Sequence, residues 1–207
     1  MRLGSGAATA LSPDGKWVLT VRLNPPPAQM VMLPTGAGEA RPVTNDALAH
    51  GVGRFTADRG HIAFAAFAPG HPPRVYLQDL SGGAAKPIAP EGVPGSPSPD
   101  GKLVAFEGKF YPADSGPSRP IPGFEPEDRI ANWAAEPETL FVLHKQPTGD
   151  FQVYRLDPTG RRTLVHQIAH PPGAVAGQWF SITPDGSAYA ITYSVSPSEL
   201  FRVTGLK

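Results

Sequence analysis

Apolar residues along this chain come in short runs, and turn-forming residues separate one run from the next. The runs are rich in Val, Ile, Phe and Tyr, as in residues 17–20, 75–78 and 103–106. Glycine and proline lie between the runs and not inside them. Short β-branched and aromatic runs bounded by such turns are typical of strands and argue against a helical repeat. The pattern therefore predicts an all-β protein.

One turn phrase recurs and divides the chain into units. Its clear copies are Ser12-Pro13-Asp14-Gly15-Lys16, Ser98-Pro99-Asp100-Gly101-Lys102 and Thr183-Pro184-Asp185-Gly186-Ser187. A weaker copy spans residues 56–60, and Glu136 stands where the remaining turn acid is expected. The Asp-Gly pair supplies the positive φ angles of a tight hairpin. The copies recur at intervals of about 43 residues, the length of a four-stranded propeller blade.

The predicted fold is a β-propeller of about five four-stranded antiparallel blades in a single domain. The repeat units span residues 5–49, 50–91, 92–127, 128–174 and 175–207 together with 1–4. We expect residues 1–4 to pair as a strand with the last blade, near Phe201, because ring closure removes two exposed sheet edges. The alternative is a fragment of a larger propeller with further blades upstream.

Composition narrows the function only by exclusion. The chain has 18 basic and 18 acidic side chains and no cysteine, so a general nucleic-acid binder and a cysteine-based metal site are not expected. No apolar stretch reaches the roughly 20 residues of a membrane span. The first residues lack the apolar core of a signal peptide. We expect a monomer without a cofactor or metal.

Two kinds of motif carry a family resemblance. The Ser-Pro-Asp-Gly-Lys turns resemble the Pro-Asp repeats of Tol-type and WD-like propellers. Residues 119–126, 154–157, 159–162 and 205–207 resemble the C-terminal propellers of bacterial membrane-linked serine/threonine protein kinases. The resemblance implies a sensory or scaffolding propeller in an extracytoplasmic location. The chain has no kinase domain, and the shared motifs are turn signals that name no active site.

The residues that most resemble catalytic sets have a simpler interpretation. The turn acids Asp14, Asp58, Asp100 and Asp185 are expected to bond their own backbone. The chain's six histidines show no zinc-binding spacing, and no serine lies in a nucleophile elbow. We therefore predict no catalytic residue and no metal ligand.

Polar residues just before each innermost strand are better candidates for ligand binding. Arg54, Asn132 and Ser181 lie four residues before a turn acid and are expected to line the central channel. The rim is expected to include Trp179, Gln178, Asp128, Arg129 and His50. Trp and Arg are the residue types that dominate binding hot spots. The competing interpretation places Trp179 in the packing between blades.

The predicted function is a non-catalytic propeller module that binds a protein or a small ligand. One alternative is a glycosidase-like hydrolase, which requires two carboxyl groups about 5–10 Å apart at the channel mouth. The acids considered for that role are Asp46, Glu107, Asp128 and Glu136. A second alternative is a structural segment of a larger propeller, with no ligand of its own.

Overall fold

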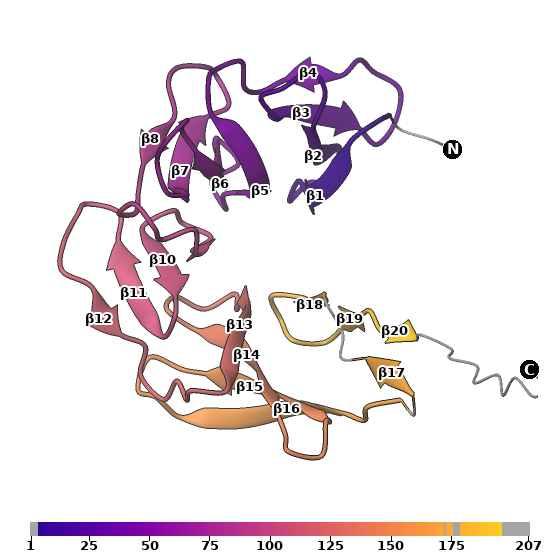
Figure 1. The fold of residues 1–207 in the computed structure, drawn as a ribbon, viewed down its shortest axis with the longest axis vertical. Coiled ribbons are helices and arrows are strands. Elements are labelled where there is room, and N and C mark those ends of the chain that lie inside the picture. The colour runs from indigo at the N-terminus through magenta and orange to yellow at the C-terminus, as the bar shows by residue number, and fades with distance from the viewer. Residues whose placement is uncertain (1–3, 172, 176–178, 196–207) are drawn as a thin grey trace, which may run out of the picture. The chain divides into compact units, whose positions relative to one another are not determined.

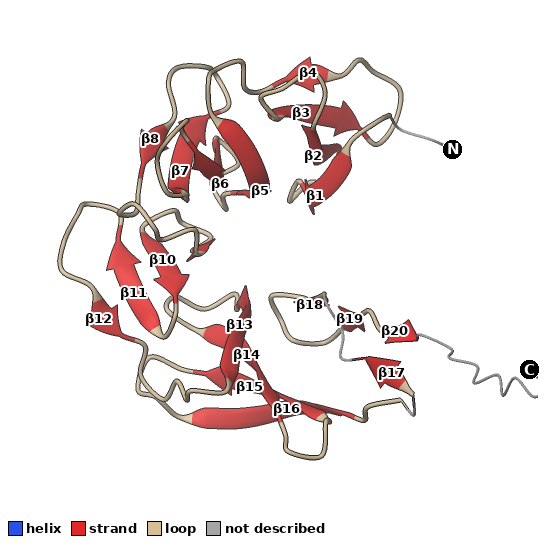
Figure 2. Cartoon of the chain, viewed as in Figure 1, coloured by secondary structure: helices blue, strands red, loops and turns tan. Residues whose placement is uncertain are grey.

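The computed structural model describes residues 4–171, 173–175 and 179–195. These residues contain strands and loops only, with no helix (Figure 2). The prediction of an all-β protein is therefore confirmed. The chain divides into two compact units, Met1–Ile121 and Pro122–Lys207. The predicted pairing of residues 1–4 with Phe201 involves residues 1–3 and Phe201, which lie outside the described part.

The first unit holds three four-stranded antiparallel sheets, each with its strands in chain order (Figure 1). The first sheet consists of β1 (Ala7–Leu11), β2 (Trp17–Arg22), β3 (Gln29–Pro34) and β4 (Arg41–Pro42). The second consists of β5 (Ala49–Phe55), β6 (His61–Phe67), β7 (Arg74–Asp79) and β8 (Lys86–Pro87). The third consists of β9 (Ser96–Pro97), β10 (Leu103–Phe106), β11 (Lys109–Pro112) and β12 (Arg119–Pro120). Each sheet is the meander expected of a propeller blade.

The second unit holds one four-stranded sheet and two short pairs of strands. Its large sheet consists of β13 (Asp128–Trp133), β14 (Leu140–Lys145), β15 (Phe151–Leu156) and β16 (Arg162–Ile168). The pairs are β17 (Ala174–Val175) with β20 (Ser194–Val195), and β18 (Phe180–Ile182) with β19 (Tyr189–Ile191).

The predicted number of four-stranded blades is wrong, because the described residues form four and not five. The fifth repeat keeps its Pro-Asp turn and first hairpin, β18 and β19, whose strands have only three residues each. The run predicted as its third strand, residues 200–203, lies outside the described part.

Apolar side chains from neighbouring sheets form the cores. In the first unit, Leu19 and Met30 of one sheet pack with Ile62 and Phe64 of the next, and all four are fully buried. In the second unit, Phe141 and Val153 pack with neighbours that include Ile182 of β18. Central strands are covered on both faces, which explains why their sequences are continuous apolar runs and not alternating ones.

The Pro-Asp turns share one hydrogen-bond pattern. In the first turn, Asp14 Oδ1 accepts from Ser12 Oγ at 2.6 Å and from the Lys16 backbone N–H at 3.1 Å. The same two bonds recur around Asp58, Asp100 and Asp185. The structural interpretation of the four turn acids is therefore confirmed.

Candidate functional site

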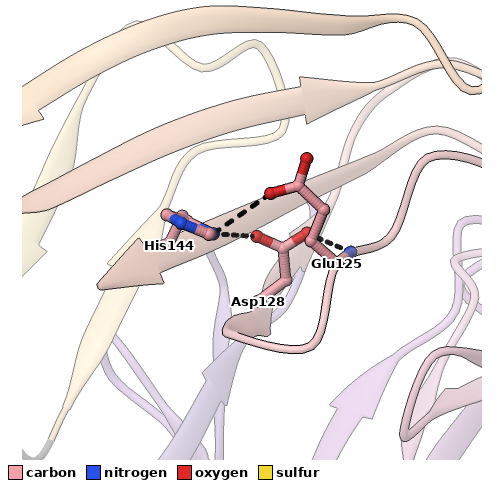
Figure 3. A group of neighbouring side chains, drawn as sticks. All are labelled: Glu125, Asp128 and His144. Carbon is pink, nitrogen blue, oxygen red and sulfur yellow. Dashed lines mark hydrogen bonds and ion pairs between the residues drawn. The ribbon is translucent and has the colours of Figure 1, made fainter. Parts of the chain in front are cut away.

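A charged cluster in the second unit is centred on Asp128, the first residue of β13. Its side chain is completely buried. Asp128 stands opposite His144 in the antiparallel register of β13 and β14. Oδ1 lies 2.8 Å from His144 Nδ1, and Oδ2 accepts the backbone N–H of Glu125 at 2.8 Å (Figure 3). The cluster thus ties the segment before β13 to the end of β14.

Arg162, the first residue of β16, completes the cluster. Its Nη1 donates to Oδ2 of Asp128, and its Nη2 donates to Oδ1 at 3.0 Å. Nη1 also donates to the backbone carbonyl of Gly123 at 2.8 Å, and the guanidinium carbon lies 4.4 Å from the ring centre of Tyr154. A two-pronged ion pair of this kind holds both partners in one orientation.

Charge balance inside the cluster sets the protonation states. Burial alone would raise the pKa of Asp128, but hydrogen bonds from Arg162, the Glu125 backbone and His144 outweigh burial and lower it. The hydrogen bond to Asp128 in turn raises the pKa of Arg162. The pair is therefore ionised at neutral pH.

The same cluster contains three residues of types that commonly bind metals, but its geometry does not fit a metal ion. One ligand atom each from Glu125, Asp128 and His144 lie within 4.8 Å of one another. Arg162 already contacts both oxygens of Asp128, and its Nε lies 3.5 Å from Glu125 Oε1. A cation at this place would meet the guanidinium charge. The arrangement is a clasp that neutralises a buried carboxylate.

Two glycines allow the clasp to close. Gly123 has φ +71° and Gly160 has φ +86°, conformations that favour glycine. A Cβ added to Gly123 would lie 2.3 Å from the carbonyl oxygen of Gly160. Gly123, Tyr154, Gly160 and Arg162 all belong to the segments that carry the kinase-linked resemblance. These motif positions therefore have a packing role in this chain.

In the first unit, two of the predicted ligand-binding residues lie on β5. The His50 side chain is fully buried, with Nε2 2.9 Å from Asp46 Oδ1 and its ring 4.7 Å from that of Phe64. Its Nδ1 is buried without a hydrogen-bond partner among the described residues. Arg54 is partly covered, and burial lowers its pKa. His50 is thus a packed residue and not a rim residue.

In the second unit, Asn132 and Ser181 lie on neighbouring strands. Asn132 Nδ2 donates to the Ile182 carbonyl at 2.7 Å, which ties β13 to β18, and Ser181 is exposed. Trp179 is 69% exposed, so its placement in the packing between blades is wrong. Arg129 is also exposed, next to the buried Asp128, and Gln178 lies outside the described residues.

Of the other three acids considered for hydrolysis, two have polar partners nearby and one lies in an exposed turn. Asp46 Oδ1 bonds His50 and the Leu48 backbone. Glu136 pairs with Arg155 at 3.0 Å, and hydrogen bonds from its own backbone and from Arg155 lower its pKa. Glu107 is exposed in the turn between β10 and β11, at φ +45°.

Sequence reasoning placed Asp128 among the candidates but missed Glu125, His144 and Arg162. The signal that could have found Arg162 was the family-like segment at 159–162, which was interpreted only as a turn.

No protein-family model and no curated protein sequence matches the chain. Solved structures do resemble it. TolB from Acinetobacter baumannii matches with a TM-score of 0.64 at 18% identity over 89% of this chain and 48% of its own. A putative TolB from Agrobacterium tumefaciens matches with a TM-score of 0.63 at 17% identity over 92% of this chain and 70% of its own. An oligogalacturonate lyase in complex with manganese matches with a TM-score of 0.60 at 16% identity, over 86% of this chain and 55% of its own.

These likenesses show a TolB-like β-propeller fold. The chain spans about half the length of the Acinetobacter protein. Because the similar structures include both TolB proteins and a lyase, the fold alone does not select a function. Among the described residues, no helix is long and apolar enough to cross a membrane.

Proposed function

We propose that this chain is a non-catalytic propeller module that binds a protein or a small ligand. The observation that carries the proposal is the Asp128–Arg162 pair. A glycosidase-type reaction needs a carboxyl group that stays protonated near neutral pH and donates its proton. Asp128 is the most buried of the four candidate acids, and Arg162 keeps it ionised. The remaining three acids are exposed, on loops or turns.

We further propose that the module is a sensory or scaffolding region linked to a bacterial signalling kinase, on the extracytoplasmic side of a membrane. The resemblance of residues 119–126, 154–157 and 159–162 to kinase-linked propellers supports this assignment. In this chain the same segments build the clasp around Asp128. A binding module of that kind needs a rigid scaffold, which the clasp provides.

A direct test separates binding from hydrolysis. The purified chain is incubated with a panel of aryl glycosides and oligogalacturonates, beside an Asp128→Asn variant whose folding is checked by circular dichroism. We expect no turnover by either protein. Turnover by the wild type that a folded Asp128→Asn variant loses would overturn the non-catalytic assignment.

A further inference from the structure

Among the four turns that carry an aspartate, one departs from the backbone rule that the other three follow. In three turns a glycine follows the turn acid with φ between +70° and +73°: Gly15, Gly101 and Gly186. In the second sheet the same position is Arg59, with φ +62°. Its backbone N–H still donates to the Thr56 carbonyl, as the N–H of Gly15 donates to the Ser12 carbonyl. A bulky residue in this conformation is strained, and such strain is often found at functional sites.

The glycine position closes the junction between neighbouring sheets elsewhere in the chain. In the first unit, a Cβ on Gly101 would lie 3.3 Å from Leu77 of the preceding sheet. In the second unit, a Cβ on Gly186 would lie 2.9 Å from the Phe141 ring. Both glycines are buried, whereas Arg59 is exposed. The junction between the first and second sheets is therefore built differently.

Hydrogen bonds between neighbouring turns depend on the residue that precedes the turn acid. The Ala57 N–H donates to the Pro99 carbonyl at 2.7 Å, and the Ala135 N–H donates to the Pro184 carbonyl at 2.9 Å. These bonds join the second sheet to the third, and the fourth sheet to the β18–β19 hairpin. The corresponding residue of the first turn is Pro13, which has no N–H to donate. The turns of the first and second sheets thus lack this connection.

An open cavity of about 370 Å³ lies at this junction, within the first unit. Its apolar wall includes Trp17, Met32, Phe55 and Leu80, which belong to or border the core shared by the two sheets. Its charged lining residues are Asp14, Arg41, Arg59 and Asp79. A cavity of this size can take one or two side chains of a partner.

The acids and the arginines of the lining differ in their bonding. Asp14 Oδ1 is held by Ser12 and Lys16, and Asp79 Oδ1 accepts the Ser81 N–H at 2.7 Å. Arg41 lies over the Trp17 ring at 5.8 Å. Within the described part of the chain, neither Arg41 nor Arg59 forms an ion pair with a carboxylate. Hydrogen bonds from Ser12 and Lys16 and, more weakly, the charge of Arg59 lower the pKa of Asp14. Both carboxylates are thus already bonded, and the two guanidinium groups are the charged lining groups whose N–H donors are left for a partner.

We propose that this cavity is a docking site for an acidic peptide segment of a partner protein. An apolar side chain of the segment enters between Trp17 and Phe55, and carboxylates beside it pair with Arg41 and Arg59. The inference rests on the proposed binding function and names the partner's chemistry. It also accounts for the arginine at position 59, where a glycine would fold with less strain.

The test uses a phage-displayed library of random heptapeptides, selected in parallel on the wild-type chain and on the Arg59→Gly variant. We expect the wild type to enrich sequences with Asp or Glu beside Leu, Phe or Trp, and Arg59→Gly to lose them. A synthetic peptide of that type should bind Arg59→Gly and Arg41→Gln at least ten-fold more weakly than the wild type. Arg161→Ala, which removes an exposed arginine of the second unit, should bind like the wild type.

Arg59→Gly also separates docking from folding. The variant should have a higher melting temperature than the wild type, so its loss of binding cannot be attributed to unfolding. Enrichment of basic or uncharged sequences would overturn the docking site. So would free glutamate that binds as tightly as the selected peptide. Sequences enriched equally on both proteins would also overturn it while leaving the proposed binding function intact. Enrichment of no sequence would count against both.

Discussion

Arg162 donates hydrogen bonds to both carboxylate oxygens of Asp128, which lies 34 residues earlier in the chain. The pair joins the first residue of β13 to the first residue of β16 and holds the carbonyl of Gly123 as well. The inner and outer strands of one sheet are thereby fixed to the segment that precedes them. A buried pair of this kind is costly to break, because the remaining partner loses its counter-charge.

Replacing the carboxylate should therefore destabilise the chain. We expect Asp128→Ala to lower the free energy of unfolding by about 3 kcal/mol, because it leaves the largely covered Arg162 guanidinium with only the longer contact to the exposed Glu125 carboxylate. Urea denaturation followed by circular dichroism measures the change. The exposed neighbour Glu127 provides the control, and Glu127→Ala should stay within about 0.5 kcal/mol of the wild type. Similar losses in the two variants would contradict the clasp.

Acid should weaken the fold through the turn carboxylates. Hydrogen bonds from Thr56 and Gly60 lower the pKa of Asp58 from 3.8 to about 2, and those from Thr183 and Ser187 lower the pKa of Asp185 to about 2. A carboxylate whose pKa is lower in the folded state stabilises the fold above its unfolded pKa. That contribution is lost as the pH falls from 3.8 toward 2.

The acid effect can be measured as the urea midpoint at a series of pH values. The midpoint of the wild type should fall as the pH is lowered from about 4 to 2. The double variant Asp58→Asn/Asp185→Asn should start lower at pH 7 and show a shallower fall. An equally steep fall in both proteins would assign the acid sensitivity to other groups.

The contact between two glycines predicts an unusually sensitive position. Gly123→Ala should cost about 3 kcal/mol, of which about 1 kcal/mol comes from the positive φ angle and the rest from contact with Gly160. Gly92 is the matched control, because it has φ +79° and open space around it. Gly92→Ala should therefore cost only about 1 kcal/mol. If the two substitutions cost the same, the close approach does not hold in solution.

The bond between turns predicts that a repeat-like substitution will be harmful. Ala57→Pro restores the residue found at Pro13 and Pro99, and a new proline in a turn usually stabilises a protein. Here it removes the N–H that donates to Pro99 and pushes the ring against that carbonyl. We expect a loss of about 1 kcal/mol in thermal unfolding experiments. A gain in stability would show that the bond contributes nothing.

The regular parts of the fold could be predicted from the sequence because their causes are local. The Ser-Pro-Asp-Gly turn contains its own hydrogen-bond partners, so Asp14 and Asp100 were assigned from their neighbours alone. The same local logic found the turn of the fifth repeat at Asp185 but overestimated the strands that follow. Strand length depends on cross-strand partners, which a turn motif does not encode.

The charged cluster could not be predicted because its partners meet through the register of the sheet. His144 faces Asp128 only because of the pairing of β13 with β14, which contains an irregularity between Ile130 and Asn132. The prediction for His50 failed for the same kind of reason. This histidine was expected on the rim, but its side chain is fully buried. A shift of one position in a strand moves a side chain to the other face.

The central claim is that Arg59 lowers the stability of the fold and binds an acidic segment of a partner. The most direct measurement is equilibrium unfolding of the wild type and Arg59→Gly, each with and without a saturating selected acidic peptide. Arg59→Gly alone should be about 1 kcal/mol more stable than the wild type. The peptide should stabilise the wild type but not the variant. A variant that is less stable than the wild type, or that gains as much from the peptide, would contradict the account.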